Sequence, residues 1–131
     1  MADERTILAG KIAITPLLNA SNALREAMTQ AKTQLEHDGA LQRFEFTYEL
    51  LWKTLKKILA FKGINVNNPY DVFREAARNQ LIDNPKFWFE VIRKRNLTTH
   101  VYNQQMADDI FDFLQHFEPE LTKVLKNIEQ L

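Results

Sequence analysis

Apolar residues recur three and four positions apart along most of the chain, which is the spacing of amphipathic helices. The first such stretch starts at Thr15-Pro16, read as an N-cap followed by a first-turn proline. Gly39 interrupts the pattern, and Asp38 is a candidate cap for the helix that follows. The apolar positions of this first helix are Leu17, Ala20, Leu24, Ala27 or Met28, Ala31 and Leu35.

The second helix is expected from about Leu41 to Phe61 and carries apolar residues on two sides. Phe46, Leu50 and Phe61 lie opposite the main stripe. A surface helix in a monomer needs only one apolar stripe, so this helix is predicted to be central or shared with another chain. The main stripe consists of Leu41, Phe44, Tyr48, Leu51, Trp52, Leu55, Ile58 and Leu59.

Two further helices complete a bundle, with a short extra helix between them and the second. Asn68-Pro69 begins the short helix, expected to end near Asn79, and Asn84-Pro85 begins the third. Strand-like alternation is absent, so the pattern predicts an all-α, up-and-down four-helix bundle over residues 14–131, with residues 1–13 as an arm or short helix. The fourth helix carries Ile110, Leu114, Phe117, Leu121, Val124 and Ile128 in one register.

Composition places this bundle in one domain without covalent staples. A chain of 131 residues, 45% hydrophobic, is long enough for a single core. The absence of cysteine excludes disulfides, thiolate metal sites and cysteine nucleophiles. The N-terminus is acidic where a secretory signal would be basic, and no run approaches the ~20 apolar residues of a membrane helix. We therefore expect a cytoplasmic protein with no membrane contact.

Charge offers little attraction to nucleic acid over the whole molecule. Seventeen basic and seventeen acidic residues give a net charge of zero, so polyanion binding would need a local patch. Lys53, Lys56, Lys57 and Lys62 form a basic strip on the second helix, more typical of a solvated face than of an RNA track. The acidic cluster at positions 108, 109 and 112 is interpreted as helix-start acids rather than metal ligands, because no histidine stands at ligand spacing to it.

The third helix ends in a group of residues suited to chemistry. On a helical wheel Arg95 falls on the apolar face with Trp88, and Tyr102, seven residues later, falls there too. Asn96 and His100 point away and neighbour each other. A guanidinium on an apolar face needs an anionic partner. Spacing alone leaves a purely structural interpretation open, in which Arg95 pairs with a carboxylate, His100 is an exposed helix-end residue and Tyr102 packs.

A longer signature lies in the second helix. Residues 43–56, RFEFTYELLWKTLK, resemble the nucleotidyltransferase substrate-binding family, which belongs to the HEPN superfamily of helical bundles. The resemblance continues through Asn68-Pro69, through residues 81–83 and through residues 95–102. It covers about residues 14–130, so residues 1–13 fall outside it.

The resemblance implies a specific activity and partner. Arg95, Asn96 and His100 match the HEPN pattern of an arginine, a polar residue, a spacer and a histidine, and Tyr102 matches a tyrosine found two residues later in this branch. Such proteins are toxins: metal-independent endoribonucleases, needing no cofactor, with the RNA site built across a homodimer interface. A minimal nucleotidyltransferase acts as the antitoxin by transferring AMP to the tyrosine.

The residue types suit that reaction. Histidine titrates near neutrality and can serve as general acid or base, typically worth about 10²–10⁴ in rate. Arginine presents a fork of donors to phosphate, while Asn96 would orient His100 or contact the sugar. One chain supplies one histidine, so a second copy would supply the other, with the second stripe on residues 41–61 as a candidate dimer contact. The alternatives are a non-catalytic subunit that presents substrate to the nucleotidyltransferase, and a dimeric scaffold that retains the motif as a relic.

Overall fold

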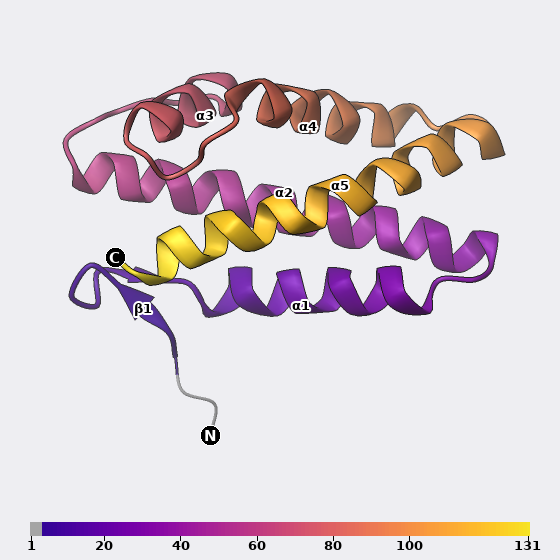
Figure 1. The fold of residues 1–131 in the computed structure, drawn as a ribbon, viewed down its shortest axis with the longest axis horizontal. Helices are drawn as coiled ribbons and strands as arrows, with labels where there is room; N and C mark the ends of the chain where they lie inside the picture. Colours follow the sequence, from indigo (N-terminus) through magenta and orange to yellow (C-terminus); the bar gives the residue numbers. More distant parts are fainter. Residues whose placement is uncertain (1–3) are drawn as a thin grey trace.

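The computed structural model describes residues 4–131 and shows a helical bundle preceded by a small hairpin (Figure 1). The chain runs back and forth through its four long helices, as the apolar spacing predicts, and the short extra helix lies between the second and the third of them. The long helices are α1 (Thr15–Gln30), α2 (Gln34–Phe61), α4 (Pro85–Leu97) and α5 (Gln104–Glu129), and the short helix is α3 (Pro69–Arg78).

Helix α2 is the centre of the bundle. It contacts α1 along one side and α3 and α4 along the other, and α5 crosses in front of it (Figure 1). Aromatic rings join these helices: Phe73 stacks on Trp88 with centroids 5.2 Å apart, and Phe44 meets Phe117 edge-on at 5.0 Å. The main stripe of α2 is buried apart from the half-buried Trp52, and the predicted apolar positions of α5 are all buried.

The connection between α1 and α2 differs from the sequence-based prediction. Helix α1 ends at Gln30, so Leu35 belongs to α2, where its side chain is 80% exposed. Helix α2 begins seven residues earlier than expected and passes through Gly39 without a break. The expected cap at Asp38 is wrong, and so is the expected N-cap at Thr15, because α1 is preceded by Ile14.

A capping box explains the early start of α2. The Thr33 hydroxyl accepts from the Glu36 backbone N–H at 3.2 Å, and the Glu36 carboxylate accepts from the Thr33 N–H at 3.0 Å. Backbone N–H donors of Lys32 and Thr33 hold the pKa of Glu36 below its usual value. Two satisfied donors offset the cost of about 1 kcal/mol for a glycine inside a helix.

The described part of the N-terminal arm, residues 4–13, forms a β-hairpin and contains no helix. Strand β1 (Thr6–Ile7) pairs antiparallel with β2 (Ile12–Ala13), and both isoleucines are buried against the bundle. The hairpin is also tied to the C-terminus, since the Leu8 N–H donates to the Leu131 carbonyl at 3.3 Å. Strands of two residues are too short to show alternation, which is why the sequence pattern missed them.

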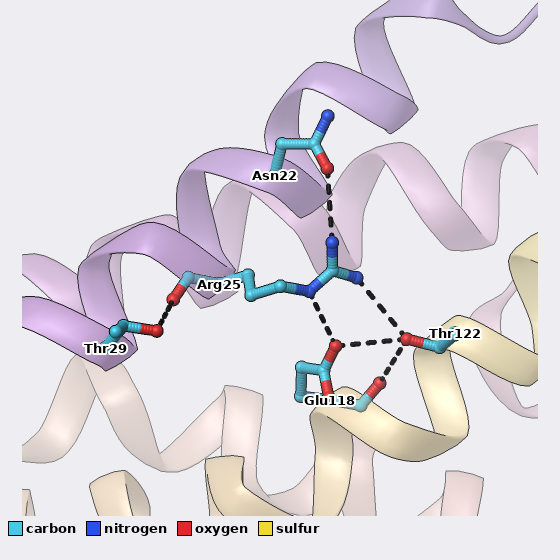
Figure 2. A network of polar contacts seen from close by, with 5 residues as sticks. All are labelled: Asn22, Arg25, Thr29, Glu118 and Thr122. Carbon is cyan, nitrogen blue, oxygen red and sulfur yellow. Dashed lines mark hydrogen bonds and ion pairs between the residues drawn. The ribbon is translucent and has the colours of Figure 1, made fainter.

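A polar network fixes α5 against α1 (Figure 2). The Arg25 Nε donates to Glu118 at 2.8 Å, and its Nη atoms reach Thr122 at 3.4 Å and Asn22 at 3.3 Å. Both charged groups are partly exposed, so the pair contributes about 1 kcal/mol or less. The network links α1 to α5, and α5 continues as one helix through Pro119.

Within residues 4–131, none of the helices combines the length and the apolar character that crossing a lipid bilayer requires.

Candidate functional site

The residues singled out in the sequence lie at one end of the bundle. Helix α4 ends at Leu97 and a single 3-10 turn, η1 (Thr98–His100), leads toward α5. The α1–α2 connection lies at the same end, at the right of Figure 1. The start of α2 lies beside η1, because Asp38 and Leu41 border the same hollow as Thr98 and Val101.

Arg95 points from the last turn of α4 toward α2. Its Nη2 lies 3.5 Å from Glu49 Oε1, and its guanidinium carbon lies 6.0 Å from the centre of the Tyr48 ring. The side chain is only 26% exposed, and its buried Nε has no hydrogen-bond acceptor among the residues described. The inward position predicted for Arg95 is confirmed, and the ion pair with Glu49 is its one salt bridge among the described residues.

Glu49 is the member of this site to which the sequence pattern gave no role. Its Oε1 pairs with Arg95, while its Oε2 accepts from the Trp52 indole N–H at 3.1 Å and lies 3.6 Å from the Lys53 ammonium. The need for an anion opposite Arg95 was visible in the sequence. The distant partner was not, because the contact joins two helices. Burial raises the pKa of Tyr48 and the Glu49 charge raises it further, while Arg95 opposes both, so Tyr48 stays neutral.

The helix stops before it reaches the end of the motif. The Thr98 hydroxyl donates to the Arg95 carbonyl at 2.6 Å, and the Thr99 hydroxyl donates to the Asn96 carbonyl at 3.0 Å. These bonds occupy carbonyls of the last helical turn and tighten the chain into η1. The wheel therefore does not apply beyond Leu97, and the prediction that Tyr102 lies on the face of Arg95 is wrong.

Tyr102 instead lies next to His100. Its hydroxyl is 3.2 Å from His100 Nδ1, and the two ring centres are 6.3 Å apart. Both residues are exposed, with Tyr102 at 79%. Because the Tyr102 hydroxyl contacts Nδ1, this contact leaves the other ring nitrogen of His100 for a different partner.

Asn96 is exposed on the last turn of α4. Within residues 4–131 its side chain makes no hydrogen bond, and its backbone carbonyl accepts from the Thr99 hydroxyl. The expected neighbour relation with His100 assumed a continuous helix, whereas His100 belongs to the 3-10 turn. In the protomer the motif is therefore divided into two pairs, Arg95 with Glu49 and His100 with Tyr102.

The acidic cluster lies farther into its helix than expected. Asn103 caps α5 by accepting from the Met106 N–H at 2.9 Å. Asp108 and Asp109 stand one turn later, each accepting from a glutamine side chain of the first turn. The part of the chain that the structure describes contains no group of three side chains able to hold a metal ion.

The comparisons with known proteins agree on one family. The sequence profile described as "Nucleotidyltransferase substrate binding protein like" matches residues 13–130. The chain is 35% identical over 97 residues to the probable ribonuclease HepT of Haemophilus influenzae, a match covering 70% of this chain and 66% of that protein, slightly under two thirds of its length.

Two solved structures share the fold. A crystal structure of a protein from Thermus thermophilus superposes with a TM-score of 0.80 at 29% identity, covering 86% of this chain and 98% of that one. A Haemophilus influenzae structure, described as revealing the fold of a substrate binding domain of a nucleotidyltransferase, gives 0.77 at 27% identity, covering 86% and 96%. The similarity therefore extends over most of the bundle.

Proposed function

The chain belongs to the nucleotidyltransferase substrate-binding protein family, and from that premise we propose that it is a HEPN-type toxin: a homodimeric, metal-independent endoribonuclease silenced by a cognate nucleotidyltransferase. One observation carries the proposal. An exposed histidine stands oriented by a tyrosine, close in sequence to an arginine whose buried Nε still lacks an acceptor among the described residues. The likeness to a probable ribonuclease supports RNA as the proposed substrate.

The proposed reaction uses the 2′-hydroxyl of the RNA as the nucleophile. One histidine accepts the 2′-proton as the oxygen attacks the adjacent phosphorus. The bond to the 5′-oxygen breaks, and a protonated histidine supplies the proton that this leaving oxygen takes up. Arg95 stabilises the negative charge on the phosphorane, because its planar fork matches two phosphate oxygens. Asn96 is exposed beside this path and is proposed to contact the sugar.

The need for both an acid and a base supports the dimer. Each chain offers one His100, and a two-fold axis beside η1 would bring two copies into one cleft. Exposed apolar side chains surround this end of the protomer, notably Leu35 on α2 and Leu97 at the end of α4. Phe46, from the second stripe of α2, is also 48% exposed, so it remains a candidate contact between copies.

Silencing by AMP transfer is supported by the position of Tyr102. In that step the Tyr102 oxygen attacks the α-phosphorus of ATP, pyrophosphate leaves, and the phenolic proton is released. The oxygen that would carry the AMP is the one in contact with His100 Nδ1. The modification would therefore remove the hydroxyl that orients the histidine and place a charged nucleotide over its ring.

The rival function is a non-catalytic subunit that presents substrate to a nucleotidyltransferase. The description of the Haemophilus influenzae structure and the high exposure of Tyr102 favour it. Expression of the chain alone separates the two functions, since only a toxin arrests growth. We expect arrest with the native chain and normal growth with His100→Ala at equal protein level. Normal growth with both would favour the accessory subunit.

A further inference from the structure

A groove of about 500 Å³ runs along α2 beyond the Arg95 site. It lies between α2, from Leu50 to Ala60, and the segment that joins β2 to the start of α1. Pro16, Leu17 and Leu50 form its apolar part. The groove therefore follows the part of α2 that is C-terminal to Glu49, away from His100.

Three lysine side chains line this groove. Lys53, Lys56 and Lys57 all border it, and none of the described residues in its lining is a carboxylate. Lys53 pairs with Glu49 at 3.6 Å, whereas Lys56 and Lys57 have no ion-pair partner among residues 4–131. Because the whole chain is neutral, this local concentration of unpaired charge is what can attract a polyanion.

An aromatic ring accompanies the lysines. Trp52 lines the groove and is half-buried, and its indole N–H is fixed to Glu49. The other tryptophan, Trp88, is fully buried in the core. An oriented, accessible indole among ammonium groups is the arrangement that single-stranded nucleic acid uses, because every base can stack on it.

The groove is joined to the candidate catalytic site through one carboxylate. Glu49 Oε1 contacts Arg95, and Glu49 Oε2 contacts both Trp52 and Lys53. The hollow on the other side, beside η1, is lined by the carboxylates of Asp38 and Glu45, which repel phosphate. Arg95 and Lys53 offset the charge of Glu49, whereas Asp38 and Glu45 have no ion-pair partner among residues 4–131. A strand held by Arg95 is therefore favoured in the direction of the lysines.

We propose that this groove binds the single-stranded RNA that flanks the cleaved phosphate, with Lys56 and Lys57 contacting phosphates and Trp52 stacking on a base. The inference rests on the proposed ribonuclease function and assigns its substrate track. It reverses the interpretation of the basic strip as a solvated face.

The test measures binding of a labelled 2′-O-methyl oligouridylate, which lacks the nucleophilic hydroxyl and cannot be cut. We compare native protein with Lys56→Gln/Lys57→Gln over a range of salt concentrations. The matched control is Lys86→Gln/Lys126→Gln, which removes two exposed lysines without ion pairs among the described residues and outside the groove. The groove variant should bind more weakly, with a salt slope smaller by about 1.4, because each phosphate contact in a single strand contributes about 0.7. The control variant should keep the native slope.

A second measurement follows Trp52 directly. Added oligouridylate should quench the tryptophan emission of the native protein, and Trp52→Phe should lose that quenching while Trp88 continues to emit. An unchanged salt slope in the groove variant, or quenching that survives Trp52→Phe, would overturn the inference.

The failures of the two proposals can be told apart. If the chain cuts RNA but the lysines do not affect binding, only the groove is wrong. If no oligonucleotide binds and no RNA is cut, the ribonuclease function fails as well. If the lysine substitutions change the mass of the native assembly instead, the groove is a contact between copies and the inference is overturned.

Discussion

The guanidinium of Arg95 is only partly satisfied by its neighbours. Its Nη2 is paired with Glu49 at 3.5 Å, but its buried Nε has no acceptor among the described residues. A buried donor without a partner costs about 1–3 kcal/mol, and a phosphate oxygen would remove that cost. Arg95 therefore retains a donor that the residues described here do not satisfy.

Replacing Arg95 by alanine should lower RNA cleavage by about 10²–10³, because losing one preorganised donor to a developing charge costs about 2.7–4 kcal/mol. The matched control is Arg93→Ala, which removes an exposed arginine of the same helix turn that pairs with Glu90. Initial rates on a labelled RNA measure both variants, and circular dichroism checks their fold. Equal rates for Arg95→Ala and Arg93→Ala would remove Arg95 from the site.

Tyr102→Phe should abolish AMP transfer and reduce RNA cleavage without abolishing it, because it deletes both the acceptor hydroxyl and the contact that orients His100, while His100 and Arg95 remain. Native protein, Tyr102→Phe and the control Tyr70→Phe are incubated with the cognate nucleotidyltransferase, ATP and magnesium, and intact masses are compared. Tyr70 is also exposed but lies on α3. AMP addition to Tyr102→Phe at the native level would place the acceptor elsewhere. Modified Tyr102 without loss of cleavage would favour the accessory subunit.

Two glycines of the α2 region differ in whether the backbone requires a glycine at that position. Gly39 lies inside α2 with helical geometry, and a Cβ added there meets nothing within 4 Å. Gly63 follows the C-cap of α2 with φ +85°, and its N–H bonds the Ala60 carbonyl at 2.9 Å. The first glycine is conformationally unnecessary, and the second occupies the left-handed position that ends the helix.

Gly39→Ala should therefore stabilise the protein by about 0.5–1 kcal/mol, whereas Gly63→Ala should destabilise it. Urea unfolding followed by circular dichroism gives both free energies of unfolding. The comparison is sharp because the substitution is chemically identical at both sites. Destabilisation by Gly39→Ala would support the break that the sequence pattern suggested at that position.

The long helices could be predicted from the sequence because their apolar periodicity is strong. The errors fall at helix ends, where one or two local hydrogen bonds determine the boundary. The stripes of α2 and α5 are buried as expected. Gly39 predicted a break between two helices, but the Thr33–Glu36 capping box starts α2 before it. The hairpin is too short for a periodic signal. At the site, Arg95 was placed correctly by the helical wheel, while Tyr102 was misplaced because two threonine hydroxyls end the helix before it.

At the scale of the whole molecule, the account requires two protomers whose motif ends meet. Light scattering should give twice the 15.4 kDa protomer mass. The absence of native cysteine allows a geometric test with single introduced thiols. Thr99→Cys, beside His100 in η1, should cross-link to its symmetry mate with a short bismaleimide. Lys62→Cys, at the opposite end of α2, should not. A monomer, or cross-linking only through position 62, would contradict the shared cleft.

The most direct measurement of the central claim is RNA cleavage by the purified chain in excess EDTA, compared with His100→Ala purified in parallel. The account predicts that the native chain cuts a labelled RNA at the same rate with and without the chelator, and that His100→Ala leaves the RNA intact while keeping its helical spectrum. Loss of cleavage in EDTA would contradict metal independence. Equal cleavage by His100→Ala would contradict the assignment of His100 as the acid and base of the reaction.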